Sequence, residues 1–428
     1  MKKILAYLIS FLLSLVATAQ TGVTFTDTIR NYFDELRTET KKGYKLWSTD
    51  LYGPILFVNP VTRTLYSNYP DSAGILKPDG KFYSGRLPAA INMANTAIDW
   101  NGRRWSMLLL PLPANKFDRI NLLAHELFHR LQPAIGFPLF NPANNHLDEK
   151  EGRIYLRLEL AALRKALTAA TPSRMRLYLT DAVTFRKYRY SIYPAAAVTE
   201  NELELNEGLA EYTGCILAGR SRKETLLHLN RVLTDFLSTP SFVRSFAYHT
   251  IPVYGYLLYA TQKHWNKNVT PATNLVDYFI RVFNLILPGD LLKSVENSLS
   301  KYNGVTIIAE ETARETKTKM LVAAYTRKFV DSSHFELRFE QMNISFDPGN
   351  IVPVGDHGSV YPNLRVSDKW GILTVSNGAL MSPNWDKITV TIPLKNDSNI
   401  FSGDGWTLVL NEGYAVIKDN DNYSLVKK

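Results

Sequence analysis

The segment His-Glu-Leu-Phe-His at 125–129 constrains the fold of this chain more than any other feature. Two histidines four residues apart bring their imidazoles to one face of the backbone only in a helix, about one turn apart. The flanking residues predict that helix over 118–132, with Asp118 as its N-cap, apolar residues at helical spacing, and Pro133 just beyond its end. The chain is therefore expected to bury the apolar side of this helix in a hydrophobic core and to leave the two histidines on its polar side.

Two imidazoles with an acid between them are typical of a catalytic zinc site. In such sites His125 and His129 would bind Zn²⁺, and Glu126 would act as a general base without binding the metal. A catalytic zinc usually has three protein ligands and an open position for water, so a third ligand is expected downstream. The metzincin pattern is excluded, because it needs Gly at 132 and His at 135, where this chain has Gln132 and Ile135.

Two candidates for the third ligand remain. His146, with Asp148 beside it, lies in a polar stretch that also fits a loop and a helix cap. Glu207 lies in a predicted helix over 199–218, which a capping box from Thr199 to Glu202 would open.

The sequence around Glu207 resembles a known zinc-binding helix. Residues 205–212 read Leu-Asn-Glu-Gly-Leu-Ala-Glu-Tyr. The Asn-Glu-Gly-x-Ala core is similar to the third-ligand helix of the gluzincin peptidases, the clan of thermolysin and alanyl aminopeptidase. The resemblance implies that Glu207 binds zinc and that Glu211, one helical turn on, orients a ligand histidine. A helix-surface acid is the alternative for Glu211.

The resemblance spans about residues 105–265 and carries further expectations. It implies that the strand from Trp105 to Leu110 borders the cleft and can pair with substrate backbone, although a core strand is the alternative. It also implies a donor to the tetrahedral intermediate between 248 and 255, for which Tyr254 is the first choice, ahead of Tyr248 and His249.

Two departures separate the chain from the aminopeptidase branch. Glu207 follows His129 by 78 residues, and no Gly-x-Met-Glu-Asn segment precedes the metal helix. The sequence thus indicates a zinc-dependent metallopeptidase with a peptide or protein substrate. There are two alternatives: a zincin-fold binding protein without activity, and a zinc hydrolase that acts on a bond other than the peptide bond. The formal charge of +9 is scattered among acids, so no nucleic-acid partner is expected.

The N-terminus predicts export. Lys2 and Lys3, an apolar run from Ile4 to Val16 and an Ala-Thr-Ala site at 17–19 are typical of a signal peptide over 1–19. The run is too short to span a bilayer, so no stable membrane insertion is expected after its removal. Cys215 is the one cysteine, which rules out an intramolecular disulfide and suits a bacterial periplasmic or secreted protein.

We predict an α+β fold with two domains. Residues 20–327 would form a zincin-like metallopeptidase domain, and residues 328–428 a β-sandwich-like domain. The first would be β-rich over 44–111 and helical over 118–326, with helices near 118–132, 148–169, 173–188, 199–218, 223–237, 250–264 and 274–284. The sequence does not fix the oligomeric state.

Overall fold

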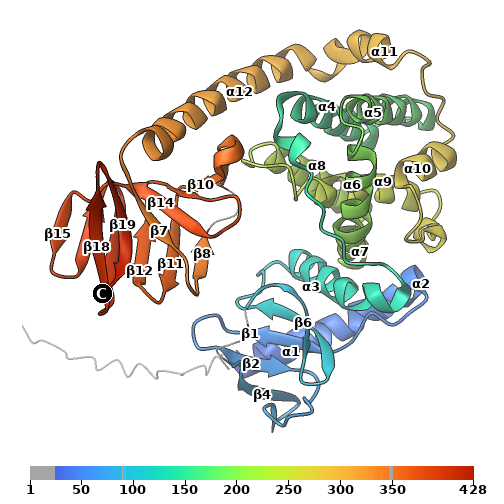
Figure 1. The fold of residues 1–428 in the computed structure, drawn as a ribbon. Coiled ribbons are helices and arrows are strands. Elements are labelled where there is room, and N and C mark those ends of the chain that lie inside the picture. Colours follow the sequence, from blue (N-terminus) through green and yellow to red (C-terminus); the bar gives the residue numbers. More distant parts are fainter. Residues whose placement is uncertain (1–24, 89–90, 92, 347–349) are drawn as a thin grey trace, which may run out of the picture.

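The computed structural model describes residues 25–88, 91, 93–346 and 350–428, and it confirms the α+β class, with about 48% helix and 21% strand (Figure 1). The signal peptide expected at 1–19 lies outside the described residues. Across the described part of the chain, no helix combines the length and apolar character needed to cross a bilayer.

A six-stranded sheet forms the N-terminal part of the molecule. Its strand order is β3-β4-β2-β1-β6-β5, so β5 is an edge strand and β6 is paired on both sides. The helix α1 (Phe25–Thr40) covers one face of the sheet together with α3. The strands are β1 (Ile55–Val58), β2 (Thr64–Ser67), β3 (Lys77–Asp79), β4 (Phe82–Arg86), β5 (Thr96–Trp100) and β6 (Arg103–Leu109).

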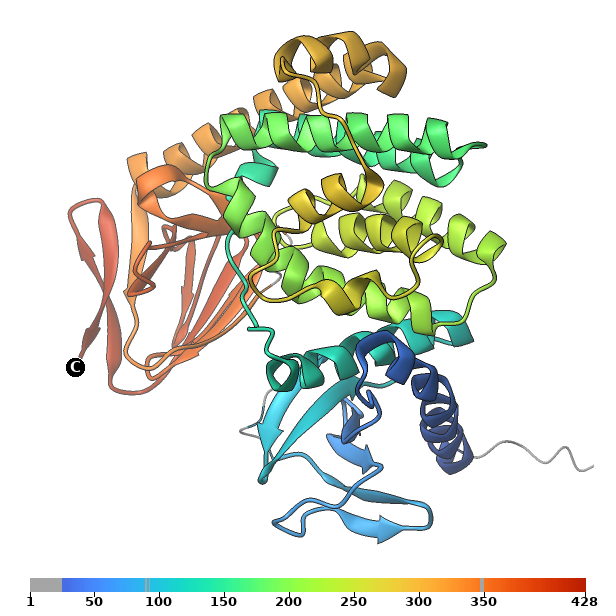
Figure 2. The same cartoon turned by 90° about the vertical axis from the view of Figure 1, so that its right-hand side faces the viewer.

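The helix α3 (Lys116–Leu131) lies between the sheet and the helical layer (Figure 2), and it has buried residues on both of these sides. Ile120, Leu123 and Leu127 pack on the sheet with α1. Ala124 and Phe128 instead belong to the large core of the helices that follow. Because α3 packs against the sheet on one side and against the helices on the other, it is fixed between them. The side chains on its remaining polar face are therefore fixed in position as well.

The helical layer contains α4 to α11, and α4 and α5 lie side by side above α6, α8 and α9 (Figure 1). Its members are α4 (Lys150–Leu167), α5 (Pro172–Ile192), α6 (Ala196–Leu203), α7 (Leu209–Leu217), α8 (Arg222–Phe236), α9 (Ala247–Tyr259), α10 (Leu275–Phe283) and α11 (Leu291–Ser298), with a π-helical turn η4 (Glu204–Gly208) between α6 and α7. Short helical turns also occur at η1 (Lys41–Gly43), α2 (Tyr44–Trp47), η2 (Gln132–Ile135), η3 (Asn145–Asp148), η5 (Trp265–Asn268) and η6 (Leu299–Tyr302).

A long helix, α12 (Gly304–Thr326), runs from the helical layer to the C-terminal strands (Figure 1). Buried Glu311 fixes it to α4 by accepting from Arg153 Nε at 2.8 Å and Arg157 NH1 at 2.7 Å. The boundary expected between residues 327 and 328 falls in the π-helical turn η7 (Arg327–Asp331).

The C-terminal strands form two sheets that share one apolar core, with Phe335 and Val390 from one sheet and Leu373 and Leu408 from the other. Their orders are β18-β19-β7-β14-β13-β10-β9 and β15-β16-β17-β12-β11-β8. The strands are β7 (His334–Arg338), β8 (Asn343–Phe346), β9 (Val352–Pro353), β10 (Ser359–Tyr361), β11 (Leu364–Asp368), β12 (Gly371–Val375), β13 (Ala379–Met381), β14 (Lys387–Thr391), β15 (Lys395–Asp397), β16 (Ile400–Gly403), β17 (Trp406–Leu410), β18 (Tyr414–Asp419) and β19 (Asn422–Lys427).

Two expected helix N-caps, Asp118 and Thr199, are wrong. The N-cap of α3 is Asn115, whose side chain accepts from the backbone N–H groups of Phe117 and Asp118, so the helix begins two residues before the predicted start. Thr199 lies inside α6 and does not cap it, because its hydroxyl donates to Asn144 Oδ1 at 2.7 Å. In both cases the hydrogen bonds at the start of the helix involve a residue of a preceding loop, Asn115 for α3 and Asn144 for α6.

Candidate metal centre

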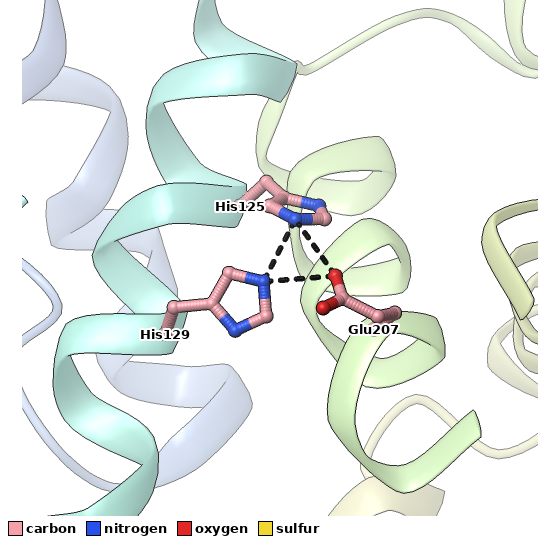
Figure 3. A group of neighbouring side chains, drawn as sticks. All are labelled: His125, His129 and Glu207. Carbon is pink, nitrogen blue, oxygen red and sulfur yellow. Dashed lines mark hydrogen bonds and ion pairs between the residues drawn. The ribbon is translucent and has the colours of Figure 1, made fainter. Parts of the chain in front are cut away.

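Three side chains from two helices converge beside the N-terminal sheet. His125 and His129 project from α3, and Glu207 projects from η4 (Figure 3). Glu207 Oε2 lies 3.0 Å from His129 Nε2 and 3.5 Å from His125 Nε2, and the two Nε2 atoms are 2.9 Å apart. The structure therefore brings together the three residues that the sequence singled out as metal ligands.

The spacing of these atoms fits a tetrahedral zinc site. Ligands at the usual zinc distances of about 2.0–2.1 Å in tetrahedral directions are about 3.3 Å from one another. The three separations here lie on both sides of that value. Two imidazoles and one carboxylate also leave one position open, as in catalytic zinc sites. Within the described residues, this is the one cluster of potential metal ligands with such spacing.

The π-helical turn η4 places Glu207 opposite α3. Gly208 and Gly214 allow the helices to approach closely: a Cβ at Gly208 would meet the side chain of Ile251 on α9 at 2.5 Å. A Cβ at Gly214 would lie 2.4 Å from the carbonyl oxygen of Asn121 on α3. π-Turns in helices often occur at functional sites, where they shift the side chains that follow. Here the turn and the two glycines set the distance between Glu207 and the histidines.

Each ligand histidine is oriented by a hydrogen bond at its other ring nitrogen. Glu211 Oε2 lies 2.9 Å from His125 Nδ1, and Glu211 is held in turn by Asn121 Nδ2 at 2.7 Å. Gln132 Oε1 lies 2.6 Å from His129 Nδ1. An acceptor at Nδ1 keeps the proton there and leaves the Nε2 lone pair for a metal. The position of Glu211 therefore matches the role that the resemblance implies.

Gln132 is a site residue that sequence reasoning missed. Its Nε2 donates to the carbonyl oxygens of Leu205 and Asn206, at 3.3 and 3.0 Å, in the turn that carries Glu207. A π-turn leaves backbone carbonyls without their usual helical partner, and the fully buried Gln132 satisfies two of them. The available signal was its place three residues after His129, where a side chain can reach back along the helix.

Glu126 is buried beside the three ligands and has an unused acceptor. Its Oε2 is buried and has no hydrogen-bond partner among the described residues. Burial raises the pKa of Glu126; His125 and His129 act to lower the pKa, and the Glu207 and Glu211 carboxylates act to raise it, so that the pKa stays above its ordinary value. For Glu207, burial acts to raise the pKa, but the hydrogen bonds with His125 and His129 outweigh it and hold the pKa well below its ordinary value. The surroundings therefore favour the protonated form of Glu126 more than that of Glu207.

Tyr248, and not Tyr254, is the tyrosine at this site. The Tyr248 hydroxyl donates to Glu207 Oε2 at 2.5 Å, and its ring stacks on His125 with centroids 5.3 Å apart. Tyr254 is 1% exposed and its hydroxyl donates to Glu159 at 3.1 Å. Six residues along α9 turn a side chain by about 240° round the axis, so the two tyrosines leave the helix on different sides. The expectation for Tyr254 is therefore wrong.

The remaining alternatives also lie elsewhere. His146 Nε2 contacts Glu200 Oε1 at 2.8 Å, and Asp148 accepts from the backbone N–H of Phe242 at 2.9 Å, so neither is a third ligand. The ring of His249 stacks on Phe236, with centroids 4.2 Å apart.

A buried ion cluster supports η4 from behind. It contains Glu159, Arg186, Arg189, Glu200 and Glu204, each 0% exposed. Arg186 donates to both oxygens of Glu204, the first residue of η4, at 2.7 Å, and its Nε donates to Glu159 at 2.7 Å. Arg189 donates to both Glu200 and Glu159. Paired, bidentate contacts of this kind offset the cost of burying the charges and fix the geometry of the turn.

Two cavities adjoin this site, and both are lined by His125 and Glu126. The triad cavity, about 200 Å³, is lined by His125, Glu126, His129 and Glu207 together with Asn95–Ala97, Leu139, Asn141, Asn206 and Tyr248. The α8-side cavity, about 480 Å³, is lined by Asn95, His125, Glu126 and Tyr248 together with Asp118, Asn121, Leu122, Glu211, His228 and Arg231. Glu126 therefore lines both cavities.

Comparison of the chain with known protein families, with curated proteins and with solved structures finds no match.

Proposed function

We propose that this chain is a zinc-dependent metallopeptidase of the gluzincin type. The observation that carries the proposal is the convergence of His125 Nε2, His129 Nε2 and Glu207 Oε2 beside a buried, unpartnered oxygen of Glu126. A structural zinc site needs no such oxygen, because its four ligands close the coordination sphere. A hydrolytic site needs one, because a proton must be taken from the attacking water.

In the proposed reaction Zn²⁺, when bound, supplies a Lewis acid that polarises the scissile carbonyl and acidifies water. Glu126 takes one proton from the water as its oxygen attacks the carbonyl carbon. Glu126 then passes that proton to the amide nitrogen, and the C–N bond breaks. The second proton of the former water moves from the new carboxyl group to the amine, so a carboxylate and an ammonium leave. Tyr248 is the nearest phenol to the ligands and is our candidate donor to the oxyanion, after it releases Glu207.

The edge strand β5 offers a place for substrate backbone. The N–H of Ser106 on β6 donates to Pro54 O on the β1 side at 3.0 Å, so Ser106 faces away from β5. Ala97 lies opposite Ser106 in the antiparallel pair, and it therefore turns its own N–H and C=O to the unpaired side. Ala97 also lines the triad cavity. An extended peptide could pair there, as in β-augmentation.

The strand that the sequence proposed for this role cannot fill it. β6 contains most of the segment from Trp105 to Leu110, and its two edges are occupied by β1 and β5. The core-strand alternative therefore describes β6, and the pairing role moves to its neighbour.

The test combines metal content with hydrolysis of a quenched peptide mixture. We expect the purified chain to hold about one zinc and to cleave peptides, Glu207→Ala to lose both properties, and Glu126→Gln to keep zinc but lose turnover. His264→Ala, an exposed histidine far along the chain from the ligands, is the matched control and should keep both. A wild-type chain without zinc affinity refutes the proposal.

The same assay separates the alternatives. A zinc-loaded wild type that cleaves neither peptides nor esters would be a binding protein without activity, whereas hydrolysis of esters alone would indicate a non-peptide substrate. Export remains part of the proposal because of residues 1–19, and a periplasmic or secreted location would be measured by fractionation of cells expressing the full chain.

A further inference from the structure

The two cavities adjoin along α3, and together they are called the cleft here. They share Asn95, His125, Glu126 and Tyr248, so the proposed base lies where they adjoin. The lining residues of α3 run from Asp118 in the α8-side cavity to His129 in the triad cavity, which is about 16 Å at 1.5 Å per residue. About five residues of extended polypeptide cover that length.

The cleft offers no free acid to hold a substrate amino terminus. Glu207 contacts His129, and Glu211 accepts from Asn121 and contacts His125. Asp118 accepts from Arg220 at 2.5 Å. Among the acids that line the cleft in the described part of the chain, only Glu126 has a buried oxygen without a partner, and that carboxylate is needed for proton transfer. A charged amino group would therefore enter without a counter-ion, whereas an internal peptide segment brings no such charge.

The two ends of the cleft differ in charge. Leu139, Asn141 and Asn206, which line the triad cavity and not the α8-side cavity, are uncharged. At the other end Arg231 projects from α8 with a side chain that is 61% exposed. Its NH2 is 3.9 Å from Asp118, which Arg220 already binds more closely, and 3.5 Å from His228 Nδ1. Much of the Arg231 guanidinium therefore stays free to bind a carboxylate.

From these features, and resting on the proposed function, we propose that the enzyme is an endopeptidase. It cleaves inside an extended polypeptide of about five bound residues and favours an acidic side chain at the Arg231 end of the cleft. The substrate class is thus an unfolded or loop segment with an acidic residue near the cleaved bond. An uncharged side chain occupies the Leu139 end.

The test uses five-residue to ten-residue peptides with acetylated and amidated termini, alongside single amino-acid amides with a free amino group. Each blocked peptide is made as a pair that differs by Glu or Lys at one position near the cleaved bond. We expect cleavage of the blocked peptides and about a five-fold higher kcat/KM for the better Glu peptide over its Lys partner, the size typical of one partly exposed ion pair.

The charge-reversal variant Arg231→Glu should invert that preference at the same position and leave the zinc content unchanged. Arg222→Glu is the matched control, because it makes the same change on the first turn of α8 but lies outside the cleft lining. It should keep the wild-type preference.

The outcomes are distinct. Hydrolysis of the free amides without cleavage of blocked peptides overturns the endopeptidase inference and leaves the peptidase proposal standing. Cleavage of blocked peptides with the same Glu-to-Lys ratio in wild type and Arg231→Glu overturns the role of Arg231. A zinc-loaded protein that hydrolyses neither class overturns the inference together with the proposed function.

Discussion

The substitution Gly214→Ala tests whether the distance between α7 and α3 sets the metal site. The added Cβ would lie 2.4 Å from the Asn121 carbonyl oxygen and 2.9 Å from Asn121 Nδ2, whereas ordinary contacts begin near 3.4 Å. One helix must therefore move by about 1 Å, since a backbone atom cannot rotate away as a side chain can. The N-terminal continuation of α7 is η4, so Glu207 moves with it.

A shift of that size changes zinc binding more than folding. Glu207 Oε2 would lie about 4 Å from the histidine nitrogens, beyond the roughly 3.3 Å of a tetrahedral site. Loss of ligand geometry or of its supporting contacts typically weakens metal binding by about 10-fold to 100-fold. Overpacking costs about 1–3 kcal/mol, of which the better helix propensity of Ala returns about 1 kcal/mol. We thus expect a net loss of stability of about 0–2 kcal/mol.

The assay is competition for zinc with a chromophoric chelator, with thermal unfolding of the zinc-free chain measured in parallel. Gly289→Ala is the matched control, because a Cβ there meets nothing within 4 Å. It should leave both quantities unchanged. A Gly214→Ala chain that binds zinc with wild-type affinity would refute the claim that helix spacing positions Glu207.

Three further predictions concern residues around the site. Gln132→Ala removes the acceptor at His129 Nδ1 and uncovers two backbone carbonyls, so zinc affinity should fall about 10-fold to 100-fold in the same competition assay; an unchanged affinity would contradict the role of Gln132. Tyr248→Phe should lower kcat about 100-fold with little change in KM. Tyr254→Phe should instead lower the free energy of unfolding by about 1–3 kcal/mol and leave kcat/KM unchanged. The reverse pattern would restore Tyr254 as the donor. For Glu200, burial acts to raise the pKa, but Arg189 and the hydrogen bond with His146 outweigh it and lower the pKa to about 2. The ionised Glu200 therefore contributes about 3 kcal/mol to the free energy of unfolding. This contribution is fully present above about pH 4.5 and is lost as the pH falls toward 2. Urea unfolding from pH 6 to pH 3 should show that loss in wild type and a flatter dependence in Glu200→Gln, and parallel curves would exclude Glu200 as its source.

The parts of the site that local spacing determines could be predicted from the sequence. The histidines share a helix face wherever residues 125–129 are helical, and the strands at Ile55–Val58, Gly371–Val375 and Trp406–Leu410 follow from short β-branched runs between turn residues. The pairing of Glu207 with those histidines came from the resemblance of one short motif.

The residues that were missed depend on long-range geometry. Whether Tyr248 or Tyr254 reaches the ligands depends on the rotation of α9, which its mainly apolar surface does not indicate. Gln132 gained its role because η4 is a π-turn, and nothing in the local sequence marks that turn. The cleft strand is β5 because of strand order, which pairing preferences along a single strand do not reveal.

The buried ion cluster has a consequence for how the protein unfolds. Three carboxylates and two guanidinium groups from α4, α5, α6 and η4 are all removed from water, and separating any one element would leave an unpaired charge in the interior. These elements therefore lose their structure together and not by fraying. Hydrogen exchange at the amides of η4 should accordingly require opening of the whole helical layer, so that Glu207, the proposed third metal ligand, stays in place until the layer unfolds.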